Sequence, residues 1–254
     1  MVDIDEVFPN PTVKQVIFQI RYPNLFYIEN RIGEFQIKIM DKFPNSSLIH
    51  RKQIIFTDIG PDGKFDVPSD VEEETGKKVW QFESDKGFQL NITSDSLDIT
   101  SAYHKTYNLD NGGSEKFRDF IEFVLENFFS VMEIPIATRI GLRYIDECPL
   151  FSKDNETFKE YYNSILPIER FDIALAKEMD FKTLMEKDNC LLRYIESLQR
   201  VNDEDKLILD FDAFTGHTKS EQCLDVTDKL HEIISEEYKK TIKKPVIEYM
   251  RQEN

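Results

Sequence analysis

The hydrophobic positions of the chain change their spacing from one segment to the next. Over residues 16–22, apolar side chains occupy every second position, which predicts a half-buried β-strand. Over 28–43, they follow a helical period that ends before Pro44, which predicts an amphipathic helix. The apolar run within 51–60 predicts another strand. The chain therefore opens with a strand, a helix and a second strand.

Three short strands and a long helix complete the first half. The stretches 77–84, 87–93 and 96–103 are rich in β-branched and aromatic residues, and their connections are short enough for antiparallel hairpins. From 114 to 132, large apolar residues recur at a spacing of about 3.6, which predicts an amphipathic helix.

The second half begins with the same alternation. Residues 136–149 predict a strand and 155–166 a helix, whereas 167–181 show no clear pattern. Two further strands are predicted at 190–199 and 206–214, joined by a hairpin. A long amphipathic helix begins near Glu221, and Pro245 is expected to kink it or to start a new helix.

The order of these elements occurs twice, in residues 12–132 and 136–253. The first strands of the two segments, "FQIRYPNLF" and "IGLRYIDECPLF", share an apolar-Arg-Tyr sequence followed by Leu-Phe. We therefore predict an α+β protein of two layers, an antiparallel sheet with long helices packed on one face, built from a duplicated β-α-β-β-β-α-type unit. Its halves, 1–134 and 135–254, would form one continuous structural unit. Coincidence between two generic α+β halves remains the alternative.

Composition narrows the classes of partner. The 254 residues carry a formal net charge of −16, so a nucleic acid or an anionic membrane is disfavoured as a partner. No apolar run approaches the ~20 residues of a membrane span, and no signal peptide is apparent. The three cysteines have no metal-ligand spacing, and we expect buried free thiols in a reducing, cytoplasmic compartment.

Charged residues interrupt the strands on the face that the helices would leave open. In "IATRIGLRYID", Arg139, Gly141 and Arg143 lie opposite the apolar set. The same alternation adds these residues: Arg21, Arg193, Asp210 and Asp212. We predict that this face binds a carboxylate, a phosphate or an acidic peptide. A ladder of cross-strand charge pairs is the structural alternative.

Gly141 suggests that something approaches the strand closely. A glycine inside a strand costs about 0.5–1 kcal/mol, so its presence predicts a notch for a ligand or another chain, or else room for a bulky neighbour. Asp210 and Asp212 could begin a metal site, but Glu196 on the neighbouring strand faces the opposite way. We expect no tightly bound metal and no cofactor, and the sequence contains no phosphate loop or nucleophile elbow.

Four stretches carry a family resemblance: "FPNPTVKQVIFQIRYP", "WQFESDKGFQLNITSDSLDIT", "RIGLRYID" and "LHEIISEEYKKTI". Together they resemble a sporadically distributed family of uncharacterised prokaryotic proteins over nearly the whole chain. Members open with Phe-x-Asn-Pro-Pro, and Thr12 here replaces the second proline. The resemblance implies a cytoplasmic bacterial or archaeal protein and supplies no activity and no catalytic residue.

Three functions remain open. The first is a non-catalytic interaction protein that uses the open polar face of its sheet to bind a protein partner or a small acidic ligand. The second is an enzyme of unrecognised type with an Arg/Asp-lined site on that face. The third is a ligand-binding grip, in which the C-terminal helix closes a curved sheet over an apolar pocket. A homodimer is left open by all three.

Overall fold

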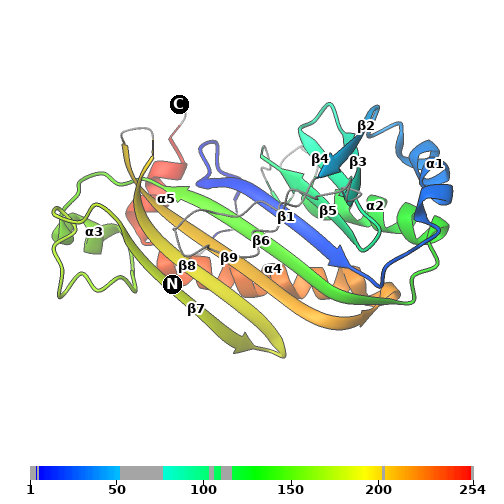
Figure 1. Cartoon of the computed structure of the whole chain (residues 1–254). Coiled ribbons are helices and arrows are strands. Elements are labelled where there is room, and N and C mark those ends of the chain that lie inside the picture. Colours follow the sequence, from blue (N-terminus) through cyan, green and yellow to red (C-terminus); the bar gives the residue numbers. More distant parts are fainter. Residues whose placement is uncertain are drawn as a thin grey trace, which may run out of the picture.

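The computed structural model describes residues 4, 6–51, 77–102, 106–109, 116–201 and 204–252, and within them the strands form one nine-stranded antiparallel sheet (Figure 1). The strands are β1 (Val13–Arg21), β2 (Asn45–Arg51), β3 (Lys77–Glu83), β4 (Phe88–Ile92), β5 (Ser96–Ser101), β6 (Ile136–Cys148), β7 (Met179–Lys187), β8 (Cys190–Val201) and β9 (Glu204–Lys219). The helices are α1 (Ile28–Ile39), α2 (Phe117–Val131), α3 (Asn155–Tyr161), α4 (Cys223–Thr241) and α5 (Lys244–Met250), and one 3-10 turn spans Ser220–Gln222.

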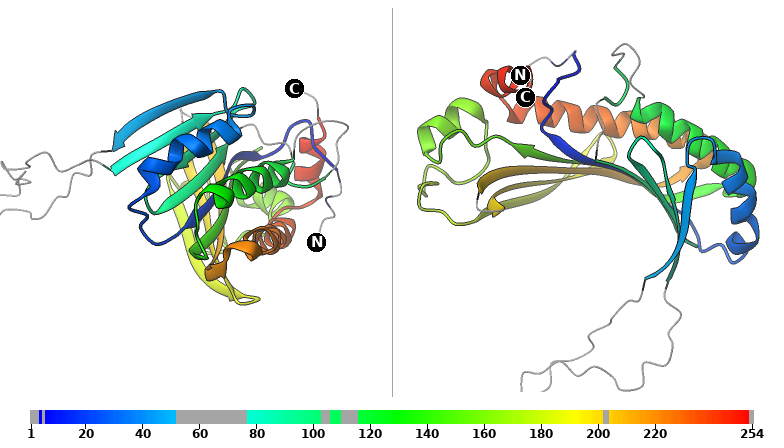
Figure 2. Two further views of the ribbon diagram at one scale, coloured as in Figure 1. Left: turned by 90° about the vertical axis from the view of Figure 1, so that its right-hand side faces the viewer. Right: turned by 90° about the horizontal axis from the view of Figure 1, so that it is seen from above.

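The molecule has two layers. The sheet arches, and α1, α2 and α4, drawn in blue, green and orange, lie on its convex side (Figure 2). The helices pack there because their apolar residues form one stripe. In α2 the buried residues are Phe117, Phe120, Ile121, Val124, Leu125, Phe128 and Val131. None of the described helices covers the concave face, which Figure 1 presents to the viewer.

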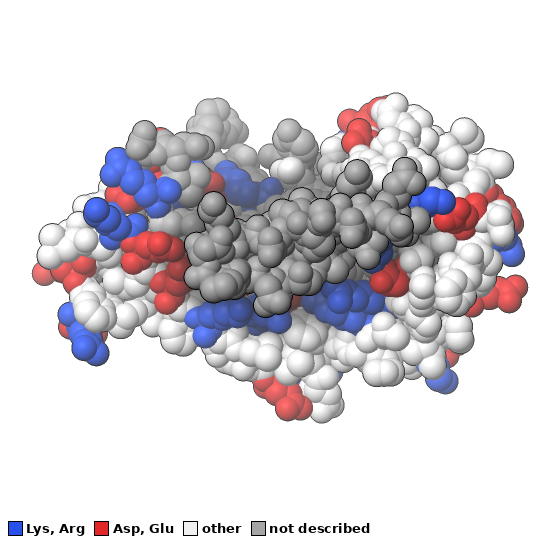
Figure 3. All heavy atoms as spheres, in the orientation of Figure 1, with Lys and Arg blue, Asp and Glu red and all other residues white. Residues whose placement is uncertain are grey.

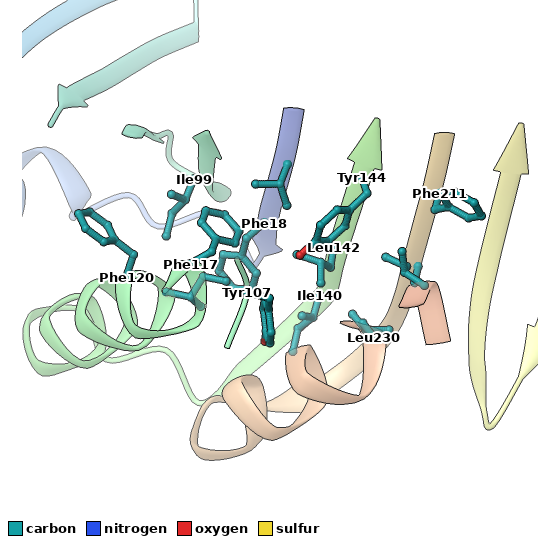
Figure 4. Close-up of a cluster of buried hydrophobic side chains, with 14 of the residues drawn as sticks. Phe18, Ile99, Tyr107, Phe117, Phe120, Ile140, Leu142, Tyr144, Phe211 and Leu230 are labelled. Atoms are coloured by element: carbon teal, nitrogen blue, oxygen red, sulfur yellow. The ribbon is translucent and has the colours of Figure 1, made fainter. Parts of the chain in front are cut away.

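Aromatic side chains fill the space between the layers (Figure 4). Phe18 from β1 and Leu142 from β6 are fully buried, as is Leu230 from α4. In the first half, the rings of Phe88 and Phe120 stack with their centroids 3.9 Å apart. The buried residues of both halves form one continuous cluster, so the sheet and its helices share a single core. Each fully buried large apolar side chain contributes roughly 1.5–3 kcal/mol.

Much of this architecture was predicted. The antiparallel sheet with its long helices on one face is confirmed, and so are the three hairpin-linked strands of the first half. Pro245 lies in the first turn of α5, so the C-terminal helix restarts there. All three cysteines are buried free thiols.

The second half differs from the prediction at β7 and α3. No strand was predicted at β7, because none of its residues is fully buried and its pattern does not alternate clearly. The helix predicted at 155–166 ends at Tyr161, after which Tyr162 forms a bridge with Ile242. In the first half, β2 begins at Asn45, earlier than the strand predicted at 51–60. That predicted strand lies outside the described residues except for Arg51.

The strand order is similar on the two sides of the centre. β1 and β6 lie side by side in the middle, and each is followed outward by the last strand of its own half, β5 or β9. Next come β4 and β8, and then β3 and β7; β2 has no counterpart among the described strands. The duplication itself remains a prediction, because a similar strand order does not show that the two halves superpose in space.

Candidate functional site

The predicted charged residues come together on the concave face. Gly141 lies directly between Gln19 of β1 and Phe214 of β9. Asp212 lies opposite Arg143 on β6 and Arg193 on β8. This placement follows from the period of two along each strand, which points alternate side chains to the same face.

The arginines of this face are paired with its aspartates. Arg143 donates two hydrogen bonds to Asp210, from Nε at 2.8 Å and from Nη2 at 2.6 Å. Asp212 accepts one hydrogen bond from Arg139 at 3.0 Å and one from Arg193 at 3.1 Å. These charge-assisted contacts are the stronger kind of hydrogen bond, and the bonds that Arg143 donates to Asp210 raise the pKa of Arg143.

Arg139 also occupies the notch predicted at Gly141. A Cβ on Gly141 would lie 2.8 Å from the Arg139 Cζ and 2.9 Å from its Nη2, far inside van der Waals contact. The guanidinium is held there by Asp212, by Gln19 and by the ring of Phe214, whose centroid is 4.7 Å from Cζ. Burial of this group lowers its pKa. The glycine therefore makes room for an arginine of its own strand, and the notch is not open.

Arg21 is the exception among the predicted arginines. It lies opposite Arg139 at the end of β1, is exposed, and donates a hydrogen bond to Gln19 at 3.1 Å. Among the described residues, no carboxylate forms an ion pair with it. Figure 3 shows Lys and Arg side chains below the centre of this face. A ligand-binding role for the predicted residues stays a prediction, whereas the charge ladder accounts for the observed contacts.

The Asp210 and Asp212 carboxylates are both occupied by arginines. Glu196 points to the opposite face, where it is fully buried and accepts hydrogen bonds from the Ile165 amide at 3.1 Å and the Tyr194 hydroxyl at 3.0 Å. Within the described part of the chain, no three His, Cys, Asp or Glu side chains are grouped to hold a metal ion.

A second candidate site lies on the helix side of the sheet. A cavity of about 430 Å³ opens between α4, the central strands, the N-terminal segment and the short stretch 106–109. Its wall is more apolar than polar, and its apolar residues include Phe8, Val13, Leu109, Ile234 and Met250. These segments are far apart in the sequence, so no local pattern located the cavity, although a pocket between the C-terminal helix and the sheet was one of the three functions left open by the sequence.

Asp146 is the buried acid of this cavity. It is only 5% exposed, on the same face of β6 as Tyr144. Its carboxylate accepts a hydrogen bond of 2.8 Å from the Thr12 hydroxyl, whose oxygen lies 2.6 Å from the Tyr238 hydroxyl. Burial raises the pKa of Asp146 to about 7. The sequence held one signal for this residue, an acid on the apolar face of a predicted strand.

His231 lines the same cavity from α4. Its ring stacks on Tyr107 with centroids 4.0 Å apart, and its Nδ1 is 3.3 Å from the hydroxyl of Tyr144. Burial lowers its pKa to about 4, so the imidazole is neutral near pH 7. Tyr107 is fixed in turn by Asp228, which accepts its hydroxyl at 2.7 Å and also binds Arg118. The imidazole of His231 thus lies between two tyrosines, one of which is itself bound to Asp228.

Comparison of the chain with known proteins gave no match. No family model matches the chain, and no curated protein or solved structure is detectably similar to it. None of the described helices is both long and apolar enough to cross a membrane.

Proposed function

We propose that the protein binds a small molecule in the cavity between α4 and the sheet. The observation that carries the proposal is the combination of an apolar wall with a few converging polar groups, Asp146, His231 and Thr12. Its volume of about 430 Å³ falls within the range of roughly 300–1,000 Å³ for small-molecule sites. Perturbed pKa values, such as those of Asp146 and His231, also tend to cluster at functional sites.

The concave face offers weaker support for a binding function. Asp210 and Asp212 already neutralise three of its four predicted arginines, Arg139, Arg143 and Arg193. A ligand would have to compete with these ion pairs. In the cavity, by contrast, a ligand would replace water against an apolar wall, which is favourable at about 25 cal/mol per Å² of apolar surface.

The neutral fluorophore N-phenyl-1-naphthylamine provides a direct test, because its emission rises in an apolar site. Ser235 on α4 lines the cavity and is half-buried, so Ser235→Trp should fill it. Asp225 is exposed on the same helix and does not line the cavity, so Asp225→Trp is the matched control. We expect saturable binding to the wild type and the control, and loss of binding in Ser235→Trp. Circular dichroism would show that both variants are folded.

Two results would contradict the proposal. The first is the absence of saturable binding to the folded wild-type protein. The second is equal binding to the wild type and to a folded Ser235→Trp variant, which would place the probe elsewhere.

A further inference from the structure

The cavity contains a carboxylate without a cationic partner. Among the described residues, only Thr12 donates a hydrogen bond to Asp146, and no lysine or arginine forms an ion pair with it. A buried ionised carboxylate costs several kcal/mol unless a positive charge compensates it. Because Asp146 lines the cavity, a ligand can supply that charge.

The aromatic rings and the rim of the cavity also favour a positively charged ligand. Phe8, Tyr107, Tyr144 and Tyr238 line it, and the faces of aromatic rings attract cations. At the rim, Glu232 is exposed and forms no ion pair with a described residue, and the chain as a whole is strongly acidic. Lys239 is the opposing basic group at the rim.

We infer that the ligand is an organic cation, an amine on an apolar body, whose charged nitrogen pairs with Asp146 while its apolar part lies against α4. This inference rests on the proposed function. A protonated amine would form a charge-assisted hydrogen bond with the carboxylate in a site of low dielectric constant, where such a bond is strong.

Asp146 should make this binding depend on pH. Tyr144 of β6 and Tyr238 and His231 of α4 line the cavity with it, as do the charged residues Glu6, Glu232, Glu236 and Lys239. Lys14 of β1 and Asp210 of β9 act on its charge from outside the cavity, Asp210 from the concave face. The imidazole titrates near pH 4, and burial raises the pKa of both tyrosines. Asp146, with a pKa of about 7, therefore dominates between pH 5 and 8, and amine affinity should rise across that range.

Tryptamine and tryptophol form a matched pair of probes, because they differ mainly in an ammonium against a hydroxyl group. By isothermal titration calorimetry at pH 8, we expect tryptamine to bind at least about tenfold more tightly than tryptophol. The preference should disappear in Asp146→Asn, which keeps a side-chain oxygen for Thr12, and it should weaken at pH 5. Glu232→Gln removes a rim charge and should change the preference much less.

The outcomes separate the two proposals. If tryptamine binds no more tightly than tryptophol, or keeps its advantage in a folded Asp146→Asn variant, the cation inference is wrong while a neutral small-molecule site can stand. If tryptamine, tryptophol and the naphthylamine probe all fail to bind the wild type, the proposed function fails as well.

An independent observation concerns the edge of the sheet at β7. No described strand pairs with its outer side, and it lies at the lower border of the molecule in Figure 1. Three of its apolar side chains are exposed: Phe181, Leu184 and Met185. A long edge with exposed apolar residues tends to pair with another strand.

Two copies of β7 can pair in several antiparallel registers, and the longest one with complementary charges is centred on Leu184, which pairs residues 181–187, whereas centring on Phe181 opposes Lys182 and Asp180 but pairs only 179–183. With Leu184 opposite Leu184 of the partner subunit, Lys182 lies opposite Glu186 of the partner subunit, and the reverse pair forms by symmetry. Shifting the centre to Thr183 places Asp180 opposite Glu186 of the partner subunit, and shifting it to Lys182 opposes two lysines. The favoured register has one cost, Asp180 opposite Asp188 of the partner subunit, beyond the end of the strand.

We propose that two chains associate along β7 in this register, with their concave faces continuous. The contact is one edge pairing, smaller than a standard interface, so the dimer should be weak and concentration-dependent. Sedimentation equilibrium should show Lys182→Glu and Glu186→Lys each weakening it at least about fivefold, and the double reversal restoring it. A monomer at the highest soluble concentration, or a dimer that both single reversals leave unchanged, would refute the pairing.

Discussion

The clearest consequence of the structure concerns Gly141. Replacing it by alanine places a methyl group where the guanidinium of Arg139 now lies, and the three atoms nearest to that methyl carbon all belong to Arg139. The arginine would have to leave, which breaks its hydrogen bonds to Asp212 and Gln19 and its contact with the ring of Phe214.

The magnitude follows from two opposing effects. A hydrogen bond to a charged group contributes about 1.5–3 kcal/mol, and the lower end applies because the Arg139 side chain is still 23% exposed. Alanine in a strand gains about 0.5–1 kcal/mol over glycine. Gly141→Ala should therefore destabilise the wild type by about 1 kcal/mol. In an Arg139→Ala background the methyl meets no guanidinium, and the same substitution should stabilise by about 0.5–1 kcal/mol.

This reversal of sign can be measured by a double-mutant cycle. Urea unfolding followed by circular dichroism would give the free energy of unfolding of the wild type, the two single variants and the double variant. The prediction requires equal slopes against urea, so that the differences reflect stability alone. If Gly141→Ala lowers the stability by the same amount with and without Arg139, then the arginine does not occupy the notch and our account of this face is wrong.

Two further predictions test the buried acids and the histidine. The pKa of Asp146 is raised to about 7, so at this residue the folded state binds more protons than the unfolded state between about pH 4 and 7, and its contribution to stability falls as the pH rises through that range. The pKa of His231 is lowered to about 4, so its contribution to stability rises with pH between about pH 4 and 6.5. Unfolding measured across this range should therefore show that, relative to the wild type, stability rises more with pH in Asp146→Asn and rises less in His231→Gln, and curves parallel to that of the wild type would contradict it. Glu196→Ala should lower the free energy of unfolding by about 2–3 kcal/mol and speed hydrogen exchange at the amide of Ile165, whereas Glu196→Gln should lower the stability less. Unchanged exchange in a folded Glu196→Ala variant would show that the carboxylate does not hold the loop at Ile165.

The alternation along the strands predicted which face each side chain occupies. Leu142 and Tyr144 point to the helices, and Arg139 and Arg143 to the concave face, because a half-buried strand exposes every second residue. The strand β7 was not predicted, because an edge strand that no helix covers has no row of fully buried residues and therefore no clear alternation.

The pairing of charges and the cavity could not be predicted in the same way. The side-chain rotamer of an arginine decides which carboxylate it binds. Arg143 lies opposite Asp212 in the register but binds Asp210, its diagonal neighbour on β9. The cavity depends on tertiary packing, because Thr12, Tyr107 and His231 come from three distant segments. The sequence shows Asp146 as an acid on the apolar face of a strand, but it does not show which residues contact it.

If the two halves arose by duplication, the alignment of their first strands and the β1–β6 register together fix where the symmetry axis would lie. If the shared Arg-Tyr sequences are aligned, Arg21 corresponds to Arg143 and Gln19 to Gly141. In the β1–β6 pairing, Gln19 and Gly141 lie directly opposite each other. A two-fold axis perpendicular to an antiparallel pair must relate two residues that face each other, so the axis for this alignment would pass between Gln19 and Gly141. We predict that β1, β5, β4 and α2 superpose on β6, β9, β8 and α4 with Gln19 falling on Gly141. An overlay of fewer than about three strands and one helix, or a best fit shifted away from that pair, would mean that the two halves converged on a common arrangement without a common origin.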